Sequence, residues 1–300
     1  DPNSSQPVLR KVLIPEYLDG AQTIKSANTD WFAEISETGV IQNYDVSISN
    51  GTENGTYLLS LGYFDNQGVI KTNSFDRISA RLNSDYKLFK SKLVVGQNLS
   101  FTKTNEVSTT PMNEAMQALP IIPIHTVDGI GWGGPIGGMN DRQNPVRLLE
   151  DNKQNGYDYT RLFGNFYGEL GLLKHLKLRS NFGIDYGNYT ARRWRKAYQS
   201  GYLNNPVNRL ESSQSHNVRT TWSNTLNYNA VFKDHRIDAF GGTELNAENF
   251  NSFWASRESF VVEDPDFMYL GAGTGTKDNG GSGAKIVLFS YFVRANNSFM

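Results

Sequence analysis

The sequence contains no cysteine. This absence excludes a disulfide framework, a thiolate nucleophile and any metal site with cysteine ligands. Long apolar runs are also missing: residues 287–293 form one of the longest, whereas a membrane-spanning helix needs roughly 20 residues. Net charge is nearly absent as well, because 29 basic and 30 acidic side chains leave a formal charge of −1. That balance gives no electrostatic case for binding nucleic acid.

Motifs of catalysis are missing too. None of the four histidines has a partner at metal-ligand spacing, and neither Gly-x-Ser-x-Gly nor His-Glu-x-x-His occurs. The glycine-rich stretches 129–138 and 271–277 do not stand between a strand and a helix, so they do not predict phosphate or dinucleotide binding. We therefore expect no enzyme activity, no cofactor and no metal.

The sequence does contain a repeated alternation of apolar and polar residues. Tyr57, Leu59, Leu61 and Tyr63 alternate with polar or small neighbours. A period of two predicts a β-strand with one apolar and one polar face. Several runs are about twice the five or six residues usual in soluble proteins, which favours strands that cross a bilayer. The expected strands are residues 40–49, 56–64, 75–84, 92–102, 159–172, 177–189, 217–230, 236–247 and 285–298.

The links between these strands alternate strictly between short and long. Outer-membrane barrels have this organisation, with tight turns on one side of the membrane and long loops on the other. We therefore predict an all-β fold: a transmembrane antiparallel β-barrel segment of about nine long strands, forming an open curved sheet. The short links lie near 50–55, 85–91, 173–176 and 231–235, and the long links near 65–74, 103–158, 190–216 and 248–284.

The expected barrel strands begin only after residue 39. Residues 1–39 lack the alternation and predict an irregular segment before the first strand, with Asp30 placed to cap a short helix that ends near Ile35. Residues 40–300 predict the partial barrel. The first residue is not Met and the last strand has no return partner, so we expect a piece of a longer chain. The long extracellular loops are expected at 103–158, 190–216 and 248–284.

Seven segments, in order along nearly the whole chain, carry a resemblance to a known family. They are residues 28–31, 42–49, 59–68, 77–83, 120–129, 179–186 and 290–296. These segments resemble the SusC/RagA-like branch of the TonB-dependent (TonB-linked) outer-membrane transporters. No plug, no TonB box and no closing C-terminal strand is recognisable, so the resemblance is to an internal barrel fragment of that family.

The resemblance implies a fold, a location and a set of partners. Members of the family are barrels of about 22 strands with an N-terminal plug, in the outer membrane of Gram-negative cells. They import oligosaccharides or peptides, work with a SusD-like surface lipoprotein as a lid, and are energised by the TonB complex. We therefore expect active import of large nutrients such as oligosaccharides. The expected contacts are with outer-membrane lipid, the lipoprotein, the solute and, through the missing N-terminal region, the TonB complex.

The polar side chains of the expected strands all lie on one side of the sheet. We predict that this side forms a polar wall facing the barrel lumen. Such a wall would hold a plug and a hydrated solute, whereas the alternative is the solvent-exposed face of a soluble sheet. The residues expected on this wall are Arg77, Arg81, Asn83, Asn98, Arg161, Asn165, Arg179, Asn181 and Asp185.

The long loops supply candidate contacts with a solute or a partner. Loops longer than about 15 residues are usually functional. Trp132, Trp194 and Trp254 have flat apolar ring faces that would stack on sugars, or else they anchor loop packing or the lipoprotein. Asp128 is a further candidate contact. In the same loop, residues 112–119 predict one or two helical turns that stop at Pro120.

Two other functions remain open at this point. A siderophore or vitamin receptor would have the same barrel architecture, and nothing in the loops excludes it. A soluble or surface-exposed β-rich adhesin would also contain alternating strands, although it would not require strands of this length.

Overall fold

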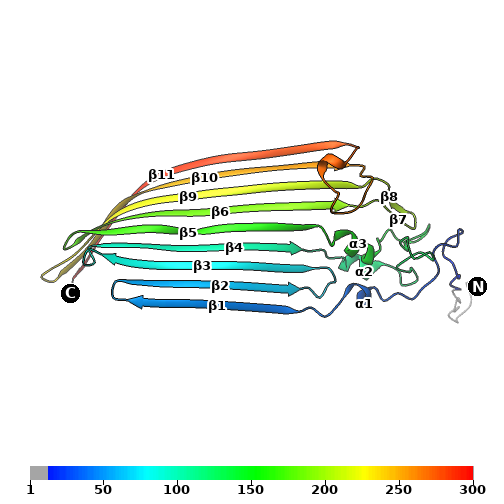
Figure 1. Cartoon of the computed structure of the whole chain (residues 1–300), viewed down its shortest axis with the longest axis horizontal. Coiled ribbons are helices and arrows are strands. Elements are labelled where there is room, and N and C mark those ends of the chain that lie inside the picture. The colour runs from blue at the N-terminus through cyan, green and yellow to red at the C-terminus, as the bar shows by residue number, and fades with distance from the viewer. Residues whose placement is uncertain (1–12, 300) are drawn as a thin grey trace, which may run out of the picture.

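The computed structural model describes residues 13–299, and a nine-stranded antiparallel sheet is its main feature (Figure 1). Each strand hydrogen-bonds to its neighbours along the chain, apart from a short separate pair, β7 (Tyr198–Ser200) and β8 (Leu203–Asn205). In spatial order, the sheet contains β1 (Ile41–Thr52), β2 (Gly55–Gln67), β3 (Ser74–Leu88), β4 (Leu93–Val107), β5 (Gly156–Leu173), β6 (Leu176–Arg195), β9 (Arg209–Phe232), β10 (His235–Glu258) and β11 (Lys277–Phe299).

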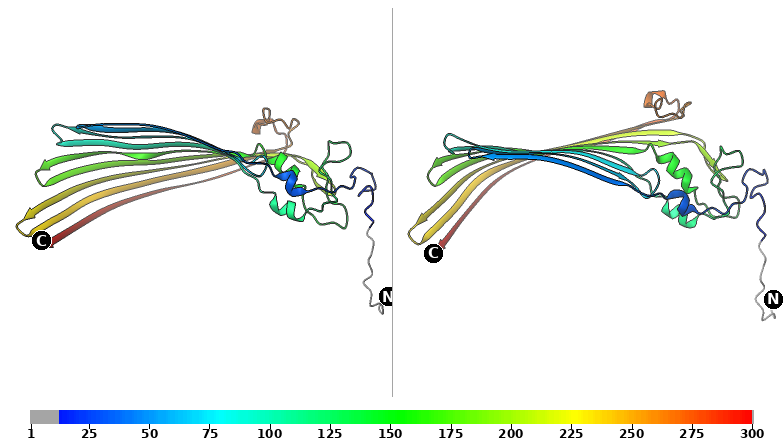
Figure 2. Two further views of the ribbon diagram at one scale, coloured as in Figure 1. Left: turned by 90° about the horizontal axis from the view of Figure 1, so that it is seen from below. Right: turned by 60° about the horizontal axis from the view of Figure 1, so that its bottom comes forward.

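The sheet is curved and open (Figure 2). Within the described residues, β1 pairs only with β2 and β11 only with β10, so the two edges do not meet. The short turns lie at one end of the sheet and the long loops at the other (Figure 1). This arrangement confirms the predicted fold class of an antiparallel all-β sheet with about nine long strands.

The strands are longer than the sequence predicts. They lengthen across the sheet from 12 residues in β1 to 24 in β9 and β10, whereas a strand needs about 9–11 residues to cross a bilayer. The strand expected at 217–230 begins at Arg209, where the residues are mostly polar on both faces. Backbone hydrogen bonds to β6 and β10 continue through this stretch, although its side chains do not alternate between apolar and polar. The alternation alone therefore could not reveal this part of the strand. The long loops are correspondingly shorter, at 108–155, 196–208 and 259–276.

The strand register separates the side chains into two continuous faces. Residues two apart share a face, and directly paired residues lie on the same side. We call the side that carries Leu59 the apolar face and the side that carries Ser60 and Arg81 the polar face. One row of paired residues crosses all nine strands on the apolar face: Ile48, Leu59, Leu82, Leu99, Gly164, Ile184, Thr220, Ala247 and Val287.

Three short helices lie at the loop end of the sheet (Figure 1). They share a hydrophobic core in which Trp31, Ile35 and Leu149 are each at most 3% exposed. No helix within residues 13–299 has the length and apolar character required to cross a bilayer. The helices are α1 (Trp31–Ile35), α2 (Met112–Gln117) and α3 (Pro145–Asn152).

The segment before β1 docks onto the loop that follows β4. Asp30 caps α1 by accepting hydrogen bonds from two backbone amides, which confirms the predicted cap. The Thr29 hydroxyl donates to the carbonyl of Ile122 at 2.7 Å, and the Trp31 indole donates to the carbonyl of Leu119 at 3.2 Å. The described part of the predicted irregular segment, from residue 13 onward, therefore packs as part of the loop structure. Residues 1–12 lie outside the described residues.

The long loops pack on opposite sides of the sheet (Figure 2). The loop between β10 and β11 contains the short 3-10 helix η1 (Leu270–Ala272), and its Phe260 and Met268 pack against Trp194 and Leu210, which lie on the apolar face. Helix α3 lies instead over the polar face, beside the ends of β5 and β6 nearer the long loops.

Candidate functional site

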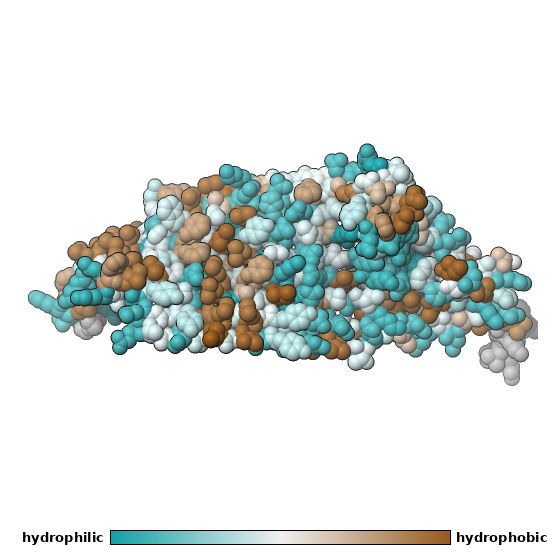
Figure 3. Space-filling model, in the orientation of Figure 1, coloured by the Kyte–Doolittle hydropathy of each residue, from teal (hydrophilic) through white to brown (hydrophobic). Residues whose placement is uncertain are grey.

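Among the residues that the structure describes, none covers the apolar face over the half of the sheet nearer the short turns. Leu61 is 53% exposed, Phe289 is 55% exposed and Val287 is 56% exposed. Figure 3 shows apolar side chains gathered in a band across this half, with polar side chains toward the loop end. A continuous exposed apolar surface of this kind marks contact with a membrane or a partner.

The nine side chains predicted to line a lumen all lie on the polar face. Two nitrogens of the Arg161 guanidinium donate to the two carboxylate oxygens of Asp185, each at 2.8 Å. The Asn98 amide donates to Asn165 at 3.2 Å, and Asn165 in turn donates to Asn181. The structure therefore brings five of the nine into direct hydrogen-bond contact. The prediction that this face lines a lumen stays a prediction.

A row of alternating charges extends this network across the sheet. Asp185 is paired directly with Arg219 in the register, and Arg219 donates to Glu248 at 2.8 Å. Arg179 lies over the ring of Tyr167, with 4.2 Å between the guanidinium carbon and the ring centroid. Exposed ion pairs contribute little to stability, because water screens the attraction between the charges. The network therefore orients the polar side chains more than it stabilises the sheet.

The three candidate tryptophans do not come together in the structure. Trp194 is only 3% exposed, and its ring packs edge-on against Phe260 with 5.1 Å between centroids. It has no free face for a sugar and serves loop packing instead. Trp132 lies 4.6 Å from the ring of His125 within the loop after β4. Trp254 lies on the polar face near the outer end of β10, and its contact with a solute stays a prediction.

Asp128 holds a turn within the loop after β4. Its carboxylate accepts hydrogen bonds from the Thr126 hydroxyl at 2.6 Å and from the backbone amides of Ile130 and Gly131 at 3.0 and 3.3 Å. These hydrogen bonds, led by that from Thr126, hold the pKa of Asp128 below its usual range. The turn is thus a local role for Asp128, and its predicted contact with a partner stays a prediction.

A cleft of about 720 Å³ opens at the loop end of the polar face, between α3 and the outer ends of β5, β6 and β9. Its lining comes from four separate segments, at 108, 143–157, 189–198 and 209–211. They meet only in the folded structure, so the sequence did not predict the cleft. The rings of Tyr157 and Tyr189 lie 5.2 Å apart at its floor. Charged residues that line the cleft include Arg147, Asp151, Arg193, Arg195, Arg209 and Glu211.

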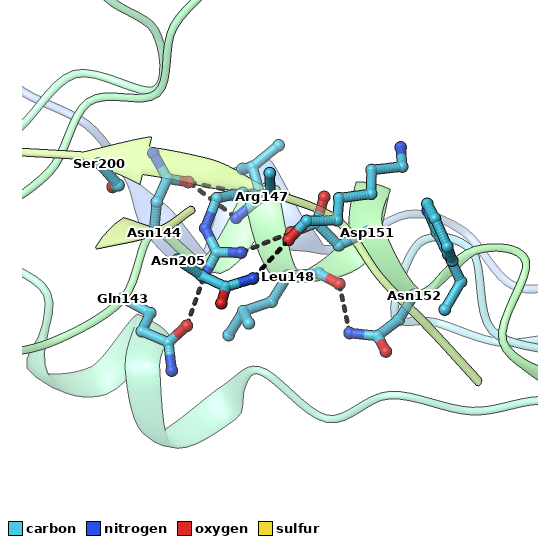
Figure 4. Close-up of polar contacts among 12 residues, drawn as sticks. Gln143, Asn144, Arg147, Leu148, Asp151, Asn152, Ser200 and Asn205 are labelled. Carbon is cyan, nitrogen blue, oxygen red and sulfur yellow. Dashed lines mark hydrogen bonds and ion pairs between the residues drawn. The ribbon is translucent and has the colours of Figure 1, made fainter. Parts of the chain in front are cut away.

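Helix α3 forms one wall of this cleft and is held by a buried arginine (Figure 4). Arg147 is 2% exposed, donates to Asp151 at 2.5 Å and to Gln143, and lies 3.6 Å from the ring centroid of Tyr198. Burial raises the pKa of Asp151, while the neighbouring Arg147 opposes this shift. Asn144 caps the helix by accepting two backbone hydrogen bonds at 3.1 Å.

The groups in the cleft are suited to binding. Guanidinium groups hold anions through charge-assisted hydrogen bonds. Tyrosine offers a flat ring face, while the hydroxyl of Tyr157 already donates to the carboxylate of Glu106. Within residues 13–299, no three His, Cys, Asp or Glu side chains are grouped to hold a metal ion.

Comparison with curated proteins identifies relatives of the chain, although no family model matches it. TonB-dependent receptor P26 from Formosa agariphila is 28% identical over 228 residues, which are 73% of this chain and 22% of that protein. TonB-dependent receptor SusC from Bacteroides thetaiotaomicron is 25% identical over 305 residues, which cover 92% of this chain and 29% of SusC. The chain matches a segment of SusC-like TonB-dependent receptors. The family resemblance carried by the seven sequence segments is thereby confirmed.

Solved structures share the fold of this chain. The RagAB peptide importer in its 'open-open' state superposes with a TM-score of 0.72 at 22% identity, over 94% of this chain and 32% of that chain. The RagAB peptide transporter gives a TM-score of 0.71 at 21% identity, over 91% and 31%. The chain thus spans a third or less of the length of each of these relatives.

Proposed function

We propose that the chain forms part of the wall of an outer-membrane barrel that imports large nutrients, with oligosaccharides as the solute. The observation that supports this most is the single two-sided sheet, whose exposed apolar face lies opposite a hydrogen-bonded polar face. Lipid would cover the apolar face and the aqueous lumen would adjoin the polar face. The SusC-like relatives favour a transporter over an enzyme.

The same proposal assigns an orientation and partners. The short turns face the periplasm of a Gram-negative cell, and the loops at 108–155, 196–208 and 259–276 face outside. Residues 1–39 are assigned to the segment that precedes the first barrel strand, and residues 40–300 to the partial barrel. A SusD-like surface lipoprotein contacts the loop end, and the TonB complex supplies energy through another region of the receptor.

Fractionation and uptake measurements on the full receptor test this proposal. We expect recovery in the outer-membrane fraction, a need for detergent, and a folded form whose gel mobility changes on heating. Oligosaccharide uptake should require both the receptor and TonB. Recovery as a soluble monomer would contradict the proposal and favour an adhesin, whereas uptake restricted to iron chelates would favour a siderophore receptor.

A further inference from the structure

The cleft at the loop end of the polar face carries a surplus of positive charge. Its lining contains five cationic side chains and two acidic ones, a difference of +3. This surplus contrasts with the whole sequence, whose formal charge is −1. The five cations are Arg147, Arg193, Arg195, Lys196 and Arg209.

Two of these cations already have acidic partners. Arg147 is paired with Asp151 at 2.5 Å. Arg209 lies 3.4 Å from Glu211 and 3.8 Å from Glu258. These pairs account for both acidic residues of the lining and for one just beyond it.

The other three cations have no ion pair among the described residues. Arg193 and Arg195 are exposed, and Lys196 is half-buried close to Asp151. Arg195 stands directly opposite Arg209 in the register, on the same face. Like charges placed directly opposite in a sheet repel each other. A bound anion would remove this repulsion and occupy the unpaired guanidinium groups.

Aromatic groups adjoin these cations. Tyr157 and Tyr189 lie on the same polar face as Arg193, with their rings 5.2 Å apart. A cleft of about 720 Å³ is within the roughly 300–1,000 Å³ usual for ligand sites. A tyrosine ring can stack on the flat face of a sugar ring, and a nearby pair of guanidinium groups can bind carboxylates. The cleft therefore suits a molecule that has both sugar rings and carboxylate groups.

We propose that this cleft binds the carboxylate groups of an acidic oligosaccharide, held by Arg193 and Arg195 and bordered by Tyr157 and Tyr189. This inference rests on the proposed function and assigns a solute class to it. Each guanidinium presents a fork of N–H donors that matches the two oxygens of a carboxylate. The cleft lies at the outer end of the polar face, where a solute arriving from outside meets the wall first.

Calorimetric titration of the full receptor in detergent tests the proposal with two probes of equal length, tetragalacturonate and neutral maltotetraose. At low salt, tetragalacturonate should bind at least tenfold more tightly than maltotetraose, and added sodium chloride should weaken its binding. The double variant Arg193→Gln/Arg195→Gln should lose at least tenfold in affinity for tetragalacturonate and keep its affinity for maltotetraose.

A matched control removes the same charge at the opposite end of the sheet. Lys174→Gln/Arg236→Gln alters two exposed cations near the short turns and should leave both affinities unchanged. Heat-modified gel mobility establishes that both double variants are folded. Equal loss in the two double variants, equal binding of the two sugars, or no binding of either would contradict the proposal, as would equally tight binding of tetraglutamate.

The two proposals fail separately. If the receptor imports neutral oligosaccharides while the cleft shows no preference for acidic ones, only the assignment of the cleft is contradicted. If the receptor is recovered as a soluble protein, the proposed function itself is contradicted.

Discussion

Leu59 and Ser60 are adjacent in the chain but meet different surroundings. Leu59 is paired with Leu82 on the apolar face, whereas Ser60 is paired with Ser47 and Arg81 on the polar face. This separation could be predicted from the sequence, because successive side chains of a strand point to opposite faces. Whether lipid, water or other protein contacts each face depends on the whole receptor. Substitutions on the two faces are therefore needed to test it.

A charge on the apolar face should be costly, and one on the polar face should not. Leu59→Arg should destabilise the folded receptor by about 2–4 kcal/mol if the residue lies near the middle of the bilayer. Ser47→Arg, on the polar face of the neighbouring strand, is the matched control and should change the free energy of unfolding little. Denaturant unfolding in lipid vesicles measures both, and equal losses would contradict the assignment of the faces.

The turn held by Asp128 should depend on pH. Its pKa is lowered in the folded state, so the ionised carboxylate stabilises the turn above the unfolded pKa of about 3.9. This contribution is lost as the pH falls through the lowered folded value. Amide exchange at Ile130 and Gly131, corrected for intrinsic rates, should therefore accelerate at low pH. Asp128→Asn should remove most of this dependence, and an unchanged pH profile would show that the carboxylate does not hold the turn.

At the scale of elements, some boundaries could be predicted from local chemistry and others could not. The cap of α1 was predicted because Asp30 precedes the helix directly. Helix α3 was missed, although Asn144 followed by Pro145 is a cap and first-turn signal that would have located its start. The outer half of β9 was missed because its pairing is a backbone property that hydropathy does not reveal.

The docking of α1 onto the loop after β4 should depend on Trp31. Trp31→Ala removes a side chain that is 3% exposed, and such cavities cost about 3–5 kcal/mol in a well-packed core. Amide exchange should accelerate in residues 13–36 and 108–155 but not in the sheet. Phe32→Ala, at a side chain that is 44% exposed, is the control and should leave these loops protected. Similar exchange in both variants would mean that this core does not hold the loops together.

At the scale of the whole molecule, the structure adds what no single segment contains. The polar wall could be predicted residue by residue, because each member follows its own strand's alternation. The cleft could not, because α3, β6 and β9 supply residues that become neighbours only when the register is known. For the same reason, the sequence could not decide between the two roles predicted for Trp194. The loop at 259–276 folds back over its ring, which favours loop packing.

The central claim is that lipid hydrocarbon covers the apolar face of the sheet. Spin labels attached one at a time to cysteines introduced along β10 measure this directly, and these 300 residues contain no native cysteine to replace. In the full receptor in lipid vesicles, accessibility to oxygen, which concentrates in hydrocarbon, should be high at Thr243, Leu245 and Ala247. It should be low at Glu244 and Asn246. Accessibility without a period of two, or with its maxima at Glu244 and Asn246, would contradict the account.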